Sequence, residues 1–212
     1  GAELVSDVIP FEEMKLRMLN GSHSFLAYLG YLAGYQHIND CMEDKNYRVA
    51  AHALMLHEQA PTLKVKGVDL GHYADLLIAR YSNPALRHRT WQIAMDGSQK
   101  LPQRMLDSVR WHLVHQKPFP LLALGVAGWM RYVGGVDEQG NAIEVSDPQL
   151  AVIQAAVKGS AEGESRVRAL LGIESIFGKE LPRETVFVDA VMTAYRSLVQ
   201  KGAKATVAQY AS

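Results

Sequence analysis

Between Pro120 and Gly134 nearly every side chain is apolar, and Arg131 carries the only charge. Apolar side chains cover the whole circumference of a helix drawn through this stretch, and two consecutive glycines follow where such a helix would end. Because a helix that is apolar all round has to be buried, we expect this segment to be the central helix of the hydrophobic core. The fold must therefore be built around a helix.

The pattern elsewhere is also helical. Over residues 11–35 apolar positions recur at intervals of three and four, and Glu12 and Glu13 lie near the start, where a helix N-terminus favours negative charge. The Asn20–Gly21 pair in the middle allows two interpretations, one long helix or two helices with Ser22 capping the second. The spacing does not decide between them.

Further helices are predicted for residues 46–59, 71–81, 102–115, 148–158, 164–171 and 183–201. Pro61 stops the first of these, and Pro102 suits a first helical turn. Gly30 and Gly34, four residues apart, would let another helix approach closely. Residues 136–148 favour an ordered loop or a small hairpin. No series of strands is present, so the predicted fold class is mainly α.

The 212 residues include 48% hydrophobic side chains and 22 basic against 22 acidic ones, which excludes a disordered tail and a basic nucleic-acid-binding arm. The length favours one domain, residues 1–212. No run reaches the roughly 18 apolar residues that a membrane span needs, so we expect neither a nucleic-acid nor a membrane partner. The single cysteine, Cys41, favours a reducing compartment, and we expect the cytoplasm.

Several cofactor and metal motifs are absent. The sequence has no Gly-x-Gly-x-x-Gly fingerprint, no phosphate-binding Gly-Lys-Ser/Thr loop and no His-Glu-x-x-His pair. His112 and His115 lie one helical turn apart but belong to an ordinary amphipathic pattern. His52 and His57 would point about 140° apart on a helix, so one metal ion could not easily bind both. We therefore expect no metal site.

Lys15, Asn20 and His23 supply a potential proton acceptor, a neutral hydrogen-bond donor and a titratable orienting group. On a continuous α-helix Asn20 lies about 140° and His23 about 80° from Lys15, over about 12 Å of rise, so all three share one broad face that a sugar-sized substrate spans. The spacing alone equally fits a solvated lysine, an Asn-Gly turn and a histidine at the edge of the core.

The sequence around these three residues is more specific. Residues 15–24 resemble the Lys-x4-Asn-x2-His signature of the polyol-specific long-chain dehydrogenases, the mannitol dehydrogenase family. The resemblance continues through residues 58–62, 81–84, 96–100 and 128–132. It implies the mostly helical C-terminal catalytic domain of that family, without the preceding NAD-binding Rossmann domain, of which residues 1–10 would be a lead-in segment.

The resemblance also implies roles for individual residues. Lys15 would be the general base that takes the alcohol proton, without a metal, and Asn20 one donor to the oxygen that becomes an alkoxide. His23 would orient the substrate, and Lys100 would contact its hydroxyl groups. A lysine acts as a base near neutral pH only if burial or neighbouring positive charge lowers its pKa, and Arg17 or His23 would contribute that charge. NAD would be bound mainly by the missing domain.

The substrate is expected from residues that depart from part of the family. Mannitol dehydrogenases resemble one another in having Arg and His where this chain has Gln92 and Met95, and residues 91–104 resemble the fructuronate reductase branch instead. A sugar acid needs a bidentate partner for its carboxylate, and Arg104 or Arg89 is the candidate. The expected reaction interconverts D-fructuronate and D-mannonate, in an enzyme of which this domain alone would be inactive.

Two alternatives remain open. Within the same chemistry, the parent enzyme would be a tagaturonate reductase or a dehydrogenase of mannitol or another polyol. In a different class, the chain would be a helical interaction module that kept the family fold and lost catalysis.

Overall fold

The structure is a computed structural model that describes residues 2–212, with side chains described from Val8 onward. The α-helices are α1 (Ala2–Met14), α2 (Gly21–Leu32), α3 (Ile38–Glu43), α4 (Lys45–Ala53), α5 (Leu70–Tyr81), α6 (Thr90–Ile93), α7 (Gly97–Leu101), α8 (Asp107–His115), α9 (Pro120–Val133), α10 (Leu150–Lys158), α11 (Glu164–Leu171), α12 (Glu174–Phe177) and α13 (Thr185–Ala211). Within residues 2–212 there is no sheet, only two isolated β-bridges. The mainly α prediction is confirmed.

Six short segments depart from α-helical geometry. Three are π-helical, η1 (Lys15–Asn20), η2 (Leu54–Gln59) and η5 (Pro102–Leu106), and three are 3₁₀ turns, η3 (Ala60–Thr62), η4 (Pro84–Leu86) and η6 (Leu181–Arg183). The π-helical segments each connect directly to an α-helix, so the chain keeps winding through them.

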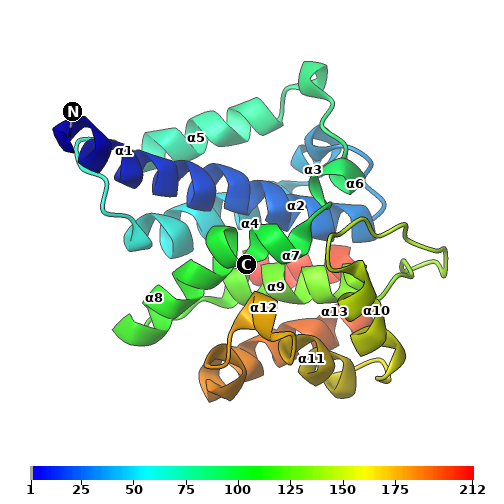
Figure 1. Cartoon of the computed structure of the whole chain (residues 1–212). Helices are drawn as coiled ribbons and strands as arrows, with labels where there is room; N and C mark the ends of the chain where they lie inside the picture. Colours follow the sequence, from blue (N-terminus) through cyan, green and yellow to red (C-terminus); the bar gives the residue numbers. More distant parts are fainter. Residues whose placement is uncertain (1) are drawn as a thin grey trace.

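The apolar segment is the centre of the molecule, as predicted. Every residue of α9 is buried except Pro120 and Arg131. It packs mainly against α13 and α2, and Figure 1 shows it in the middle of the assembly, with α2 and α4 above it and α11 and α12 below. No helix in the described part of the chain is both long and apolar enough to cross a membrane.

The structure decides between the two interpretations of residues 11–35. Asn20 (φ −71°, ψ −34°) and Gly21 (φ −63°, ψ −49°) both have right-handed helical backbone angles, so no turn interrupts the chain there. α1, η1 and α2 form one unbroken run, visible in blue in Figure 1. The expected lead-in, residues 1–10, is helical from Ala2 onward, and Gly1 lies outside the described residues.

Two other expectations need correction. The helix predicted to begin at Pro102 begins at Gly97 and passes through the proline in the π-helical segment η5. Gly30 and Gly34 do not act as a pair: a methyl group at Gly30 would collide with the Cys41 sulfur, whereas Gly34 has φ +88° beyond the end of α2 and faces open space. Only Gly30 therefore permits a close approach.

The connections around α9 are ordered loops. Val136 and Ala142 form an isolated bridge, and the Asp137 Oδ1 atom accepts hydrogen bonds from the backbone N–H groups of Gln139 and Asn141. The expectation of an ordered loop or small hairpin for residues 136–148 thus holds at its tip.

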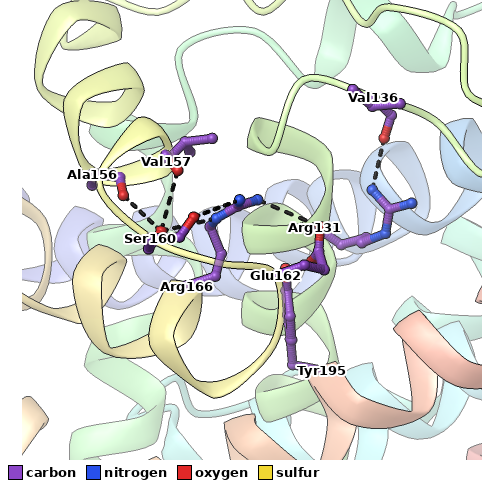
Figure 2. A network of polar contacts seen from close by, with 8 residues as sticks. All are labelled: Arg131, Val136, Ala156, Val157, Ser160, Glu162, Arg166 and Tyr195. Carbon is purple, nitrogen blue, oxygen red and sulfur yellow. Dashed lines mark hydrogen bonds and ion pairs between the residues drawn. The ribbon is translucent and has the colours of Figure 1, made fainter.

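Figure 2 shows a polar network that fastens the turn between α10 and α11 to the core. The buried Arg166 donates from Nε to Ser160 Oγ at 3.0 Å and from Nη2 to Ser160 O at 3.1 Å, and its Nη1 lies 3.5 Å from Glu162. The hydroxyl of Tyr195, on α13, donates to Glu162. These contacts hold the outer helices α10 and α11 against α13.

Candidate functional site

The three π-helical segments come together. η1 packs against both η2 and η5, although the three are far apart in the sequence. Such segments, in which hydrogen bonds run from residue i to residue i+5, are rare and occur frequently at functional sites. Their meeting point contains Asn20 and Arg104, two residues singled out from the sequence, and is the candidate functional site.

The wider turn of η1 changes the geometry expected for Lys15 and Asn20. The Gly21 N–H group, just after the segment, bonds to the Leu16 carbonyl five residues earlier. Because an i→i+5 turn holds more than four residues, two positions five apart are separated by roughly 50° instead of the about 140° of an α-helix. Lys15, which is exposed, and Asn20, which is half-buried, therefore lie more nearly on one side than the sequence predicts.

Arg104 connects η5 to the end of η1. Its Nη1 donates to the Asn20 carbonyl at 3.3 Å and to Ser24 Oγ at 2.9 Å. Both hydrogen bonds that the guanidinium makes to described residues come from this one nitrogen. The side-chain amide of Asn20 itself has no hydrogen bond to another described residue, so it is available as a donor.

His23, about one helical turn after Asn20, packs against two other aromatic rings. Its imidazole stacks on Tyr81 with centroids 5.3 Å apart and an interplanar angle of 12°, and lies 5.4 Å from His88. Burial, followed by the charges of His88, Arg104 and Lys100, lowers the pKa of His23 to about 3. Its Nε2 is buried without a hydrogen-bond partner. The ring is therefore neutral at neutral pH and brings no positive charge to the site, contrary to expectation.

Arg17 contributes to the architecture of η1. Its Nη1 donates to both the carbonyl and the Oγ1 of Thr62, at 3.1 Å each, and its Nη2 lies 4.0 Å from Glu13. The guanidinium is thus directed to η3 and to a carboxylate.

Lys100 lies next to Gln92 and Met95. Its Nζ donates to the carbonyl of Ile93 at 3.0 Å, at the end of α6. Burial, with the nearby charge of Arg104, holds the pKa of Lys100 below its usual value. Gln92 is exposed on α6 and Met95 is half-buried just beyond it. Of these three residues, only Lys100 is near the residues already described, since its charge acts on His23 and that of Arg104 acts on it.

The Asp96-Gly97-Ser98 motif lies at the start of α7. Ser98 donates to the Asp147 carboxylate from its backbone nitrogen at 2.9 Å and from Oγ at 2.5 Å. Asp96 is in the left-handed region, with φ 59°. A methyl group at Gly97 would lie 2.5 Å from Trp129 Nε1, so α7 begins directly against the central helix. These contacts fix the start of α7, the helix that carries Lys100.

The two arginines proposed for a carboxylate lie in different places. Arg89 is exposed and its backbone bridges His37, outside the contacts described for η1. Arg104 is half-buried, contacts Asn20 and lowers the pKa of His23. The geometry thus places Arg104, and not Arg89, in contact with η1.

Sequence reasoning overlooked the residues that support η1. Tyr81 donates from its hydroxyl to the Leu19 carbonyl at 2.6 Å and lies 2.8 Å from Ser22 Oγ. Gln59 is fully buried, and its Nε2 donates to the Arg104 carbonyl at 2.8 Å. Tyr81 and Gln59 stand in the motifs 81–84 and 58–62 that carry the family resemblance, and these motifs are the signal that could have pointed to them.

Three histidines outside the candidate site have structural partners. His112 Nε2 hydrogen-bonds to the Glu58 carbonyl, His115 Nδ1 to the Trp111 carbonyl, and His52 pairs with Asp75 at 2.9 Å. Within the described part of the chain no three His, Cys, Asp or Glu side chains are grouped as a metal site would require.

Comparison with known proteins identifies the family. Residues 7–199 match the mannitol dehydrogenase C-terminal domain. The chain belongs to that family. It is 77% identical over 210 residues to an uncharacterized oxidoreductase of Escherichia coli, YdfI, covering 99% of this chain and 43% of that protein. It is 62% identical over 209 residues to the D-mannonate oxidoreductase of Escherichia coli, covering 98% of this chain and 43% of that protein.

A solved structure gives the same fold. The Pseudomonas fluorescens mannitol 2-dehydrogenase, in a ternary complex with NAD and D-mannitol, superposes with a TM-score of 0.89 at 35% identity, over 96% of this chain and 41% of that protein. This mannitol dehydrogenase domain therefore spans only about two fifths of the length of the relatives that it matches.

Proposed function

We propose that this domain is the substrate-binding half of an NAD-dependent, metal-independent oxidoreductase that interconverts D-fructuronate and D-mannonate. The observation that carries the proposal is the π-helical segment η1, which begins at Lys15 and ends at Asn20, with the neutral ring of His23 on the following turn. Oxidation of a hydroxyl group to a carbonyl requires a base to take its proton and hydrogen-bonding groups to hold its oxygen. An amine, an amide donor and a neutral imidazole can serve these purposes.

Each residue then has a distinct task. Lys15 Nζ accepts the proton of the substrate hydroxyl during oxidation and returns it during reduction, since both directions follow the same path. The Asn20 side-chain N–H donates to the substrate oxygen while negative charge develops there. The unpartnered Nε2 of His23 is a hydrogen-bonding group for a neighbouring substrate hydroxyl, and Lys100 supplies a second one.

NAD, when bound, supplies or accepts the hydride. The described residues contain no glycine-rich turn between a strand and a helix that would hold its phosphates, and no sheet on which to build one. We assign NAD binding to a part of the whole protein outside this chain, in keeping with the longer relatives. The exposed Lys15 then faces a cleft between the two parts, and the isolated domain is inactive.

The choice of a sugar acid is supported by two observations. Gln92 and Met95 flank Ile93, whose carbonyl accepts a hydrogen bond from Lys100, and the family resemblance implies Arg and His at these two positions in mannitol dehydrogenases. Arg104 contacts Asn20, and its planar guanidinium is suited to two parallel hydrogen bonds with a carboxylate. The 62% identity to a D-mannonate oxidoreductase supports the same substrate.

The test is a substrate panel with the whole protein. NADH consumption is measured in parallel with D-fructuronate, D-tagaturonate and D-fructose. We expect kcat/KM for D-fructuronate to exceed that for D-fructose by at least about tenfold, since fructose has no carboxylate to pair with Arg104. D-Tagaturonate carries the same carboxylate, so the expected preference for D-fructuronate over it rests on the identity to the D-mannonate oxidoreductase. A preference for tagaturonate or fructose would overturn the substrate and keep the chemistry. No reduction of any sugar by a folded, NADH-binding protein would favour a non-catalytic helical module.

A further inference from the structure

We propose that Gln59 is a positioning residue for the catalytic segment η1, acting through the Arg104 carbonyl and Gly21. The inference rests on the proposed function, because it concerns the placement of Asn20. The two side-chain hydrogen bonds of Gln59 go to Arg104 and Ser108, and none of the roles assigned above involves Gln59. Its own environment carries the argument.

The side-chain amide of Gln59 is held at both ends. Its Nε2 donates to the Arg104 carbonyl at 2.8 Å, and its Oε1 accepts a hydrogen bond from the Ser108 hydroxyl. The residue is fully buried, so the amide has no water to replace either partner. One orientation of the amide is therefore fixed, and it connects η2 to η5.

The Gln59 amide and the Arg104 carbonyl pack closely against the backbone of Gly21, the residue that follows Asn20. A methyl group at Gly21 would lie 2.8 Å from Gln59 Nε2 and 2.9 Å from the Arg104 carbonyl. These distances are too short for any side chain, so glycine allows the amide and the carbonyl to pack against the main chain. The position of the amide thus determines how closely η5 approaches η1.

The contacts form a closed ring that begins and ends on η1. Arg17 donates to Thr62, and Thr62 Oγ1 donates to the Gln59 carbonyl at 2.7 Å. Gln59 holds the Arg104 carbonyl, and the Arg104 guanidinium reaches the Asn20 carbonyl. Removing the Gln59 amide breaks the hydrogen bond to the Arg104 carbonyl and so opens the ring at a fully buried position. The distance between the end of η1 and η5 is then no longer fixed.

The experiment compares three variants of the whole protein. Gln59→Leu keeps the volume and removes both hydrogen bonds, and Gln59→Glu keeps an acceptor for Ser108 and removes the donor to Arg104. Ser108→Ala is the matched control, because it leaves the bond to Arg104 intact. We measure kcat and KM for D-fructuronate and NADH, and amide hydrogen exchange over residues 15–24.

We expect both Gln59 variants to lower kcat by about 10- to 100-fold with KM for NADH within about threefold, since a small displacement of a catalytic group costs this much. Exchange over residues 15–24 becomes faster while exchange in α13 is unchanged, and Ser108→Ala stays within about threefold in kcat. A purely structural role would lower the melting temperature and leave kcat of the folded enzyme unchanged.

Two outcomes separate this inference from the function on which it rests. If the wild-type protein turns over sugar, and Gln59→Leu keeps both its kcat and its exchange over residues 15–24, the positioning role is wrong. If no sugar is turned over and exchange still increases in Gln59→Leu, the coupling of Gln59 to η1 stands and the proposed function fails.

Discussion

At the scale of single residues, burial decides which groups carry charge. The proposed site contains several basic side chains, yet His23 stays neutral because its ring is enclosed by Tyr81 and His88 and lies near positive charges. From the sequence, His23 could be placed on the correct helix but its charge could not, since burial depends on Tyr81 and His88, more than fifty residues away. Arg17, expected to act on Lys15, turns instead to Thr62 and Glu13.

Glu58 shows the same principle in a residue that no catalytic step uses. Its two carboxylate oxygens accept hydrogen bonds from the backbone nitrogens of Leu121 and Leu122, at 2.9 and 2.8 Å, at the start of α9. Burial raises its pKa from 4.5 to about 7, although these two hydrogen bonds act in the opposite direction. A buried carboxyl thus caps the central helix.

This pKa predicts a pH-dependent stability. In the unfolded chain Glu58 loses its proton near pH 4.5, whereas the folded protein keeps it until about pH 7, so the folded state binds more protons in between. The stabilisation is therefore complete below pH 4.5 and is lost as the pH rises through 7. The side chain of Glu58→Gln cannot ionise. Between pH 4.5 and 7 we therefore expect the free energy of unfolding of this variant to fall less than that of the wild type, with a difference of up to about 3 kcal/mol.

The measurement is urea unfolding of the whole protein at several pH values between about 4.5 and 7.5. The exposed Glu43, changed to Gln, is the control and is expected to follow the wild type. If the free energy of unfolding of Glu58→Gln changes with pH in the same way as that of the wild type, the Glu58 carboxyl does not change its pKa from 4.5 to about 7 on folding, and this prediction is wrong.

At the scale of the elements, the periodicity of the sequence located most helices and missed the π-helical segments. The ranges predicted for α5, α9 and α11 agree with the structure to within about one residue. A change to i→i+5 hydrogen bonding leaves the spacing of apolar residues at threes and fours almost unaltered, so η1 read as ordinary helix. The predicted helix start at Pro102 was wrong for a related reason. Proline lacks an N–H group, yet the helix continues through Pro102 because this segment is π-helical.

Close packing of α2 against α3 gives a prediction at this scale. A methyl group at Gly30 would overlap the buried Cys41 sulfur, which has no room to move in the core. We expect Gly30→Ala to lower the free energy of unfolding by about 1–3 kcal/mol. At Gly71, on α5, the same methyl group would meet only Asp69 Oδ1 at an ordinary 3.4 Å, and Gly71→Ala should be neutral or stabilising by up to about 1 kcal/mol.

Thermal or urea unfolding of the two variants beside the wild type provides the measurement. Equal stabilities of Gly30→Ala and Gly71→Ala would contradict the assignment of Gly30 as a contact glycine, since both residues lie in helices and differ chiefly in what surrounds them.

At the scale of the whole molecule, the central helix α9 supports a site on one side and a set of covering helices on the other. The sequence predicted this helix because a fully apolar stretch must be buried, and the family motifs supplied the candidate site residues, whose roles stay a prediction. Neither pattern predicted that η1, η2 and η5 meet, because that contact joins segments more than thirty residues apart. The proposed substrate choice rests on Gln92, Met95 and Arg104, and the substrate panel is its test.

The central claim is that η1 carries the proton-transferring group. The most direct measurement is the rate of D-fructuronate reduction by the whole protein with Lys15→Met, beside Lys45→Met as a control on an exposed lysine of α4. We predict that kcat falls by about 10²- to 10⁴-fold in Lys15→Met, with KM for NADH nearly unchanged, and that Lys45→Met matches the wild type. A folded Lys15→Met protein that reduces the sugar at the wild-type rate would contradict the account.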